Sequence, residues 1–222
     1  MLLAGIQANF GLDPRLKHSG VTTWEVIRGP PDTQQRAAGL FTLNRPKRIL
    51  LYGFGPYRPF HENITAKIVK ALPPQPGLRR VVFPVRFHRK QFVNALDRFR
   101  PDIVLGLGQS SRRRIDIELQ AANRRRGRRT AKPRPISPRG PKRLKTTLKM
   151  TPAGPQAGRS ANAGEYVCNF SMYVMLEHIQ RNELDIPYGF IHIPHDCEQK
   201  KAAGLIEKIL RRCQRVSLNA QR

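Results

Sequence analysis

The sequence predicts a single α/β domain in three layers, α/β/α, built on a mixed, mostly parallel sheet. From residue 46 onward, short apolar runs that end in Gly or Pro alternate with segments whose apolar residues recur at helical spacing. Such alternation is typical of a mostly parallel sheet that is covered by helices on both faces. The length of 222 residues suits one domain of moderate size. Functional residues of such folds lie at the carboxyl ends of the strands.

The first half of the predicted domain alternates strand and helix. The run KRILLYGFGP at residues 47–56 is a buried strand that breaks into a turn. Asn63 precedes ITAKIVKAL, whose apolar positions share one helical face, so we expect Asn63 to be the N-cap. We then expect a strand in residues 79–87, a helix in residues 89–100 and a strand in residues 101–109.

The second half is expected to continue the same pattern. The threonines of LKTTLKM, residues 144–150, favour a strand, and its charges suit only a sheet edge. A helix is expected in residues 168–182, followed by a strand, GFIHIP, in residues 189–194. The segment at residues 198–213 is amphipathic and closes the domain as a helix.

The ends of the chain are expected to lie outside this domain. Residues 1–46 show weak periodicity and scattered Gly and Pro, which predicts a poorly ordered N-terminal extension. The domain is assigned to residues 47–215 and a flexible tail to residues 216–222. No long apolar run or secretory signal pattern is present, and three cysteines without metal-ligand spacing indicate neither a disulfide framework nor a structural metal site. We therefore expect a cytoplasmic protein that does not enter membranes.

Positive charge dominates the chain, with 41 Lys and Arg against 15 Asp and Glu and a formal net charge of +26. Much of it lies in the segment RRRGRRTAKPRPISPRGPKRLK, residues 124–145, which is rich in proline and cannot bury a core of its own. One interpretation is a solvated basic loop; the other is a loop that binds polyanions weakly and without sequence preference. Aromatic residues do not alternate with the arginines, so base stacking is not supported.

Three titratable residues occupy comparable places in the α/β order: Glu118 after the third strand, Cys168 at the start of a helix and His192 in the last strand. A helix N-terminus favours a thiolate, an imidazole can take and return its proton, and a carboxylate can orient the imidazole. Each residue also has an ordinary interpretation. His192 would be a satisfied core residue, Glu118 the partner of a neighbouring arginine and Cys168 an inert thiol. Spacing alone leaves both sets of interpretations open.

Four motifs resemble those of the pyroglutamyl peptidase I (pyrrolidone-carboxylate peptidase) family. The segment SANAGEYVCNFSMY, residues 160–173, resembles its cysteine signature in the Ser, the Ala-Gly, the Tyr-x-Cys-Asn and the later Tyr. The motif LLYGFGPY resembles its first strand and aromatic turn, LGLGQ with ELQAAN its Gly-rich turn and Glu-x-x-Ala-x-Asn signature, and GFIHIP its histidine strand. The resemblance spans about residues 47–213.

This resemblance implies a cysteine peptidase that removes N-terminal pyroglutamate from peptides through an acyl-enzyme. It assigns the catalytic roles to Glu118, Cys168 and His192. Phe54 and Tyr57 match positions that embrace the lactam ring, although both could equally be ordinary core residues. The family needs no metal or organic cofactor, so none is expected. The alternative function is a basic nucleic-acid-binding or polyanion-binding protein on a degenerate hydrolase fold.

The sequence also departs from the family pattern. Arg58 and Pro59 replace the usual Gly-Gly, Ile64 stands where Pro is usual, and Leu119 follows the expected catalytic glutamate in place of Arg. None of these changes affects the three expected catalytic positions. The resemblance implies that the loop corresponding to residues 124–159, which is less basic in the family, supplies an arginine near the oxyanion. Arg128 has a plausible distance from Glu118 but cannot be distinguished from its arginine neighbours, and we assign no residue to that role. The sequence leaves open whether the protein forms a homo-oligomer.

Overall fold

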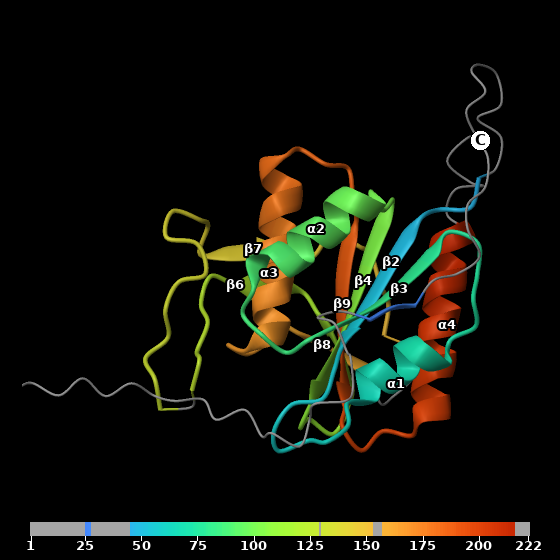
Figure 1. The fold of residues 1–222 in the computed structure, drawn as a ribbon, viewed down its shortest axis with the longest axis horizontal. Helices are drawn as coiled ribbons and strands as arrows, with labels where there is room; N and C mark the ends of the chain where they lie inside the picture. Colours follow the sequence, from blue (N-terminus) through green and yellow to red (C-terminus); the bar gives the residue numbers. More distant parts are fainter. Residues whose placement is uncertain (1–24, 28–44, 129, 153–156, 216–222) are drawn as a thin grey trace, which may run out of the picture.

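A seven-stranded sheet runs through the centre of the molecule (Figure 1). The computed structural model describes residues 25–27, 45–128, 130–152 and 157–215. In spatial order the strands are β1 (Glu25–Ile27), β3 (Leu78–Phe83), β2 (Ile49–Phe54), β4 (Ile103–Ser110), β9 (Tyr188–Pro194), β5 (Ile115–Glu118) and β8 (Ala157–Ser160). Within the described strands of this sheet, only the pairs β1–β3 and β5–β9 are antiparallel. The sheet is therefore mixed and mostly parallel, as predicted.

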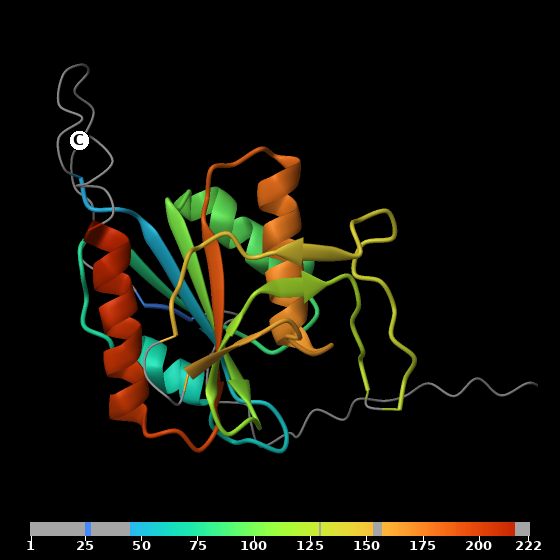
Figure 2. The same ribbon diagram turned by 180° about the vertical axis from the view of Figure 1, so that it is seen from behind.

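Helices cover both faces of this sheet (Figures 1 and 2). The helices α1 (Ile64–Ala71) and α4 (Gln199–Arg215) lie on one face. The helices α2 (Arg89–Phe99) and α3 (Val167–Arg181) lie on the other. The predicted α/β/α layers are confirmed. None of the helices in the described part of the chain has the length and apolar character needed to cross a bilayer.

The interior strand β2 is apolar along its whole length because both of its faces are buried. Leu50, Tyr52 and Phe54 point into the core between the sheet and the α2–α3 layer. Ile49 and Leu51 point into the core under α1 and α4. Successive side chains of a strand alternate between its faces, so a strand covered on both sides needs an unbroken apolar sequence.

The turn after β2 is fixed by Asn63, which is the N-cap of α1 as predicted. The side-chain Oδ1 of Asn63 accepts a hydrogen bond from the Thr65 amide at 3.0 Å, and its Nδ2 donates to the Gly55 carbonyl at 3.0 Å. The hydroxyl of Thr65 accepts from the Phe54 amide at 3.0 Å. One asparagine and one threonine thus tie the helix start to the end of the strand.

Residues 144–150 differ from the predicted edge strand. Only the short β7 (Arg143–Lys145) forms there, and it pairs with β6 (Gln120–Ala122) in a separate two-stranded sheet. Beyond β7, the Thr146 amide donates to the Leu119 carbonyl and the Thr147 amide to the Tyr188 carbonyl, both at 2.9 Å. Because these consecutive amides donate to different segments, the chain does not continue as a regular strand.

The N-terminal segment contributes one element to the fold. Residues Glu25–Ile27, within the predicted extension, form β1 and pair antiparallel with β3. The rest of the segment up to residue 44 lies outside the described residues, as does the predicted tail at residues 216–222.

Asn123 organises the irregular part of the basic segment before β7. Its Oδ1 accepts hydrogen bonds from the amides of Ile136 and Ser137 at 2.8 and 2.9 Å. Its Nδ2 donates to the carbonyls of Ser137 and Gly140 at 2.7 and 3.1 Å. A single side chain therefore satisfies four backbone groups of a segment that has little regular structure.

We predict that Asn123→Ala destabilises the protein by about 2 kcal/mol, because half-buried backbone groups lose their partners. The melting temperature should fall by about 4–8 °C for a domain of this size. Thermal unfolding monitored by circular dichroism measures the change. The control is Asn94→Ala on the exposed side of α2, which should leave the melting temperature nearly unchanged. Equal melting temperatures for the two variants would contradict this role of Asn123.

Candidate functional site

A pocket of about 540 Å³ opens beside the carboxyl ends of β2 and β4 and the first turn of α3. It contains both aromatic residues and two of the three catalytic residues that the sequence predicted. Its walls are formed by Phe54, Tyr57, Arg58, Asn63, Val85, Arg86, Phe87, Gln109, Gly127, Ala163, Tyr166, Val167, Cys168 and His192.

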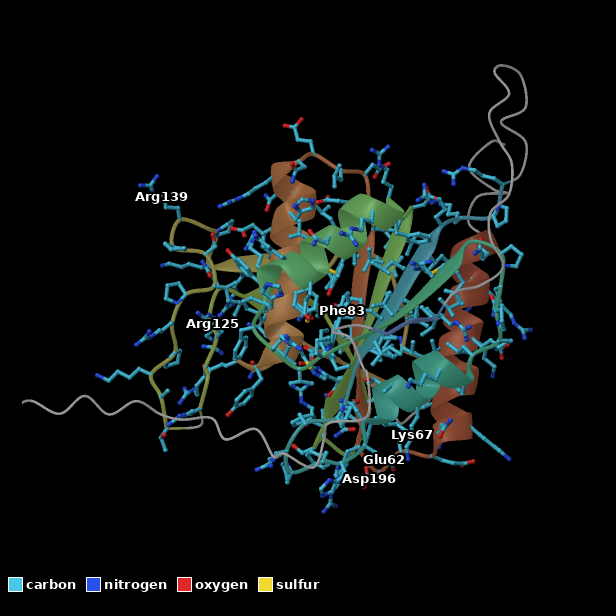
Figure 3. All side chains as sticks on the ribbon, in the orientation of Figure 1. Glu62, Lys67, Phe83, Arg125, Arg139 and Asp196 are labelled. Atoms are coloured by element: carbon cyan, nitrogen blue, oxygen red, sulfur yellow. The ribbon has the colours of Figure 1, made fainter. Side chains whose placement is uncertain are left out.

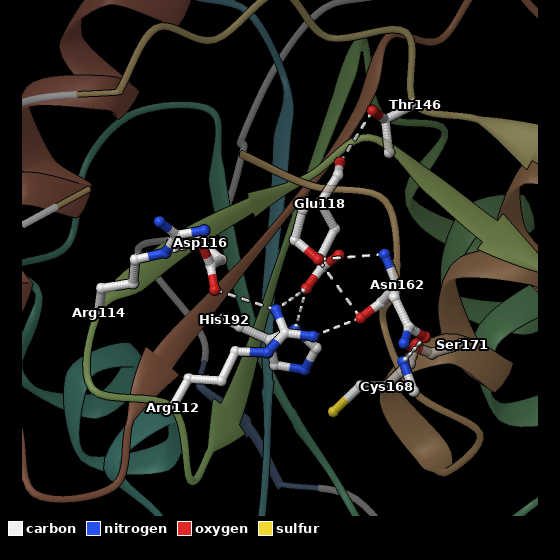
Figure 4. A network of polar contacts seen from close by, with 11 residues as sticks. Arg112, Arg114, Asp116, Glu118, Thr146, Asn162, Cys168, Ser171 and His192 are labelled. Atoms are coloured by element: carbon white, nitrogen blue, oxygen red, sulfur yellow. Dashed lines mark hydrogen bonds and ion pairs between the residues drawn. The ribbon is translucent and has the colours of Figure 1, made fainter. Parts of the chain in front are cut away.

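Glu118 lies behind the pocket and contacts His192 directly (Figure 4). The strands β5 and β9 run antiparallel with Asp116 opposite His192, so the end of β5 reaches the histidine ring. The Oε1 atom of Glu118 and the Nδ1 atom of His192 are hydrogen-bonded at 2.7 Å. Glu118 is 0% exposed and His192 5% exposed, so this pair is shielded from water.

Cys168 is the second residue of α3 and is half-buried. Its backbone N–H lies in the first helical turn, where amides have no acceptor within the helix. The space over Gly108 of β4 is shared by the thiol and the imidazole. A Cβ atom on Gly108 would lie 2.8 Å from the Sγ of Cys168 and 2.8 Å from the Nε2 of His192. The strand must carry glycine here for these two atoms to approach each other.

Electrostatics favour a protonated His192 next to an ionised Glu118. Burial by itself lowers the pKa of His192, but the adjacent thiol of Cys168 and carboxylate of Glu118 outweigh it and raise the pKa to about 9. Burial by itself raises the pKa of Glu118, but its contacts with His192 and the positive charge of Arg112 hold it below the usual value. The site can therefore hold an imidazolium at neutral pH.

Arg112 and Asp116 extend this network, and sequence reasoning assigned neither of them a role (Figure 4). The Nη1 of Arg112 donates to Glu118 Oε1 at 2.8 Å and to Asp116 Oδ2 at 3.0 Å. Arg114 donates to the other Asp116 oxygen at 2.9 Å. Glu118 is thus both the partner of an arginine and the partner of His192. Residues 116 and 118 are two positions apart in a strand and so lie on the same face of it. This spacing in the sequence could have indicated that Asp116 lies close to Glu118.

Gln109 at the end of β4 is a second residue that sequence reasoning missed. Its Oε1 accepts a hydrogen bond from the Ile64 amide at 2.9 Å, which orients the side chain. Gln109 is 8% exposed and lines the pocket. Its buried Nε2 has no acceptor within hydrogen-bond distance among the described residues, although the Gln109 side chain interacts with the nearby Tyr57 hydroxyl. Buried amide groups are normally paired, so this Nε2 is available to a ligand. Its position at the carboxyl end of a strand was the available signal.

Phe54 and Tyr57 both lie on the pocket wall. Phe54 is 1% exposed and packs edge-on against Tyr52 and Phe92, with ring centroids 5.8 and 6.4 Å apart, so it is a core residue as well as a wall residue. Tyr57 is half-buried, and its ring lies 5.3 Å from that of Phe60. The sequence left open whether Phe54 is a binding residue or a core residue, and its position on the pocket wall and in the core is compatible with both.

The first residues of the basic segment also reach the pocket, which differs from a wholly solvated loop. Gly127 lines it, and the guanidinium of Arg125, a residue labelled in Figure 3, lies 5.4 Å from the ring centre of the wall residue Phe87. The Nε of Arg126 donates to Glu165 at 2.5 Å. These contacts hold the start of the segment against the site.

Cysteine peptidases use a thiol, an imidazole next to it and a carboxylate that holds the imidazole. This site has a thiol at a helix start, an imidazole and a buried carboxylate in the same order. The described residues include no group of three or more His, Cys, Asp or Glu side chains placed to hold a metal ion.

Comparisons with known proteins identify the family. The family described as "Pyroglutamyl peptidase" matches residues 47–208. The pyrrolidone-carboxylate peptidase of Halalkalibacterium halodurans is 30% identical over 166 residues, which cover 66% of this chain and 83% of the relative. That of Oceanobacillus iheyensis is 34% identical over 169 residues, covering 67% and 84%. The chain therefore belongs to the pyroglutamyl peptidase I family of cysteine exopeptidases.

Solved structures agree in fold. The pyrrolidone carboxyl peptidase of Thermococcus litoralis matches with a TM-score of 0.68 at 22% identity, covering 79% of this chain and 96% of that one. The pyroglutamyl peptidase I of Bacillus amyloliquefaciens matches with a TM-score of 0.63 at 24% identity, covering 73% and 92%. The alternative of a nucleic-acid-binding protein on a degenerate fold is not favoured, and weak polyanion binding by the basic segment stays a prediction.

We predict that Gly108→Ala lowers kcat/KM on a pyroglutamyl substrate by at least about 100-fold, because the added methyl group separates the thiol from the imidazole. The control is Gly55→Ala, whose Cβ would meet its nearest neighbour at an ordinary 3.7 Å. Both variants are checked for folding by circular dichroism before their rates are compared. A folded Gly108→Ala enzyme with the rate of the control would contradict the shared space over Gly108.

Proposed function

We propose that Cys168, His192 and Glu118 form a catalytic triad that removes N-terminal pyroglutamate from peptides through an acyl-enzyme. The main support is the 2.7 Å hydrogen bond between His192 and the buried Glu118. Cys168 lines the same pocket as His192. Membership of the pyroglutamyl peptidase I family supports the substrate class.

In the first step the Cys168 thiol gives its proton to the Nε2 of His192, and its sulfur attacks the acyl carbon that joins pyroglutamate to the next residue. Glu118 accepts the Nδ1–H of His192, which fixes the tautomer and stabilises the imidazolium. The tetrahedral intermediate collapses when His192 returns the proton to the leaving amine. The peptide departs with a free N-terminus, and a thioester to Cys168 remains.

The helix start is suited to the charge that develops on the carbonyl oxygen. The backbone N–H of Cys168 is the natural oxyanion donor, and one such donor typically contributes about 3 kcal/mol to transition-state stabilisation. In the second step His192 removes a proton from water, which attacks the thioester and releases pyroglutamate. Cys168 then recovers its proton, so the cycle leaves the enzyme unchanged.

Recognition of the pyroglutamyl ring needs apolar walls and a few hydrogen bonds, because the ring is small and uncharged. Phe54, the last residue of β2, and Tyr57, on the turn after it, supply aromatic walls. The unpaired Nε2 of Gln109 can donate a hydrogen bond to a carbonyl oxygen of the ring. Leaving that amide unpaired in a complex would be unfavourable, so it favours ligands with an acceptor at this point.

Cys168→Ser should abolish hydrolysis of pyroglutamyl-p-nitroanilide and should remove the iodoacetamide-sensitive thiol of the site. Cys197→Ser and Cys213→Ser are the controls. Burial raises the pKa of both control thiols, so they react slowly with iodoacetamide. The control variants should therefore keep both activity and its inactivation by iodoacetamide. Full activity in Cys168→Ser would refute the proposed nucleophile.

The pH dependence tests the role of Glu118. On a pyroglutamyl-alanyl peptide, kcat/KM should fall as the pH rises through about 9, because His192 then loses the proton that the leaving amine needs. Glu118→Gln removes the charge that helps raise this pKa, so the falling limb should move to lower pH by at least about one unit.

The matched control for this profile is Glu165→Gln, which removes a carboxylate near the pocket that pairs with Arg124 and Arg126. Its falling limb should stay near that of the unmodified enzyme. If Glu118→Gln leaves the limb in place as well, the carboxylate does not hold the imidazolium.

A further inference from the structure

Two arginines on the pocket wall have no partner in the proposed chemistry. Arg58 lies in the loop between β2 and α1, and Arg86 in the loop between β3 and α2. Both side chains are exposed to solvent. In the described part of the chain, neither guanidinium pairs with a carboxylate. Two loops that are far apart in the sequence thus bring unpaired positive charge to the same pocket.

The carboxylates next to the pocket wall already have partners and so cannot neutralise that charge; Glu62, next to the wall residue Asn63, pairs with Lys67. None of the residues that line the pocket is Asp or Glu. Glu165, next to the wall residue Tyr166, pairs with Arg124 at 3.3 Å and with Arg126 at 2.5 Å. Glu118 lies behind the wall and pairs with His192 and Arg112. The uncompensated charge on the solvent side of the pocket is therefore positive.

The pyroglutamyl group gives no reason for this charge, because the lactam ring is neutral. Its binding is served by the buried end of the pocket, where Phe54 and Gln109 lie. The rest of the bound peptide must extend from the ring through the open side of the pocket, past the exposed Arg58 and Arg86. Guanidinium groups bind carboxylates well because their planar N–H groups can donate two parallel hydrogen bonds.

We propose that Arg58 and Arg86 select pyroglutamyl peptides with acidic side chains in the two positions that follow the pyroglutamyl group. This inference rests on the proposed function, since it takes the ring to occupy the buried end of the pocket. Charge complementarity at an exposed rim favours one class of substrate without changing the reaction itself.

The test compares two peptide amides of equal length, pyroglutamyl-Glu-Glu-Tyr-amide and pyroglutamyl-Gln-Gln-Tyr-amide, which differ only in charge. Both are mixed at equal concentration with the enzyme at low salt, and the released tripeptide amides are quantified by mass spectrometry. The ratio of the two rates gives the ratio of kcat/KM. We expect the acidic peptide to be preferred about tenfold, which corresponds to about 1.4 kcal/mol from two exposed ion pairs.

A double variant assigns the preference to these residues. Arg58→Gln with Arg86→Gln should bring the ratio close to one. The control is Arg139→Gln with Arg143→Gln, which removes the same charge from exposed positions; Arg139 lies at the outer end of the β6–β7 loop (Figure 3). The control should keep most of the preference. An equal loss in both double variants would mean that the net charge of the protein, and not the pocket arginines, causes it.

The outcomes separate this inference from the function on which it rests. Cleavage of both peptides at equal rates by the unmodified enzyme would overturn the acidic preference and leave the peptidase proposal standing. Cleavage of neither peptide, nor of pyroglutamyl-p-nitroanilide, would overturn the peptidase proposal itself. Because the unmodified enzyme alone decides between these results, the inference can be refuted even if the double variant does not fold.

Discussion

The hydrogen bond between His192 and Glu118 connects two antiparallel strands and holds a carboxylate that water does not reach. A buried carboxylate is costly unless it is paired, and removing one partner leaves the charge uncompensated. Arg112 supplies the second partner and also bonds to Asp116 and to the Asn162 carbonyl. The carboxylate of Glu118 thus joins three parts of the site. It binds His192 on β9 and Arg112 on the β4–β5 turn, and Arg112 in turn binds the loop that precedes α3.

The asparagines near the expected catalytic residues act on the backbone. Asn169, next to Cys168, is fully buried and exchanges hydrogen bonds with both backbone groups of Ala122, at 2.8 and 2.9 Å. It also donates to the Arg124 carbonyl at 2.8 Å. Asn169 therefore locks the chain that follows Glu118 against the helix that carries the thiol. The amide side chain of Asn169 thus helps to set the spacing between Glu118 and Cys168.

The sequence predicted the strands and helices in which burial fixes the spacing of the apolar residues. Apolar runs identified β2, β3, β4 and β9, and helical spacing identified the four helices of the described residues. It did not predict β5 and β8, because charged residues such as Asp116 and Arg159 interrupt their apolar pattern. The resemblance to a family assigned catalytic roles to Glu118, Cys168 and His192, which spacing alone had left open. Arg112 and Gln109 were not predicted. Their importance depends on contacts across the sheet, and a row of three arginines gives no sign of which one turns inward.

The excess of positive charge is compatible with this chemistry because of where the charge lies. In the proposed mechanism, once the Cys168 thiol has given its proton to His192, the site contains two anions, at Cys168 and Glu118, and two cations, at His192 and Arg112. Alternating charges of this kind stabilise one another in a site that water barely enters. Arg58 and Arg86 on the pocket wall are exposed, where water and salt weaken their mutual repulsion. A strongly basic chain can therefore hold a buried site whose charges are balanced while exposed arginines keep the pocket rim positive.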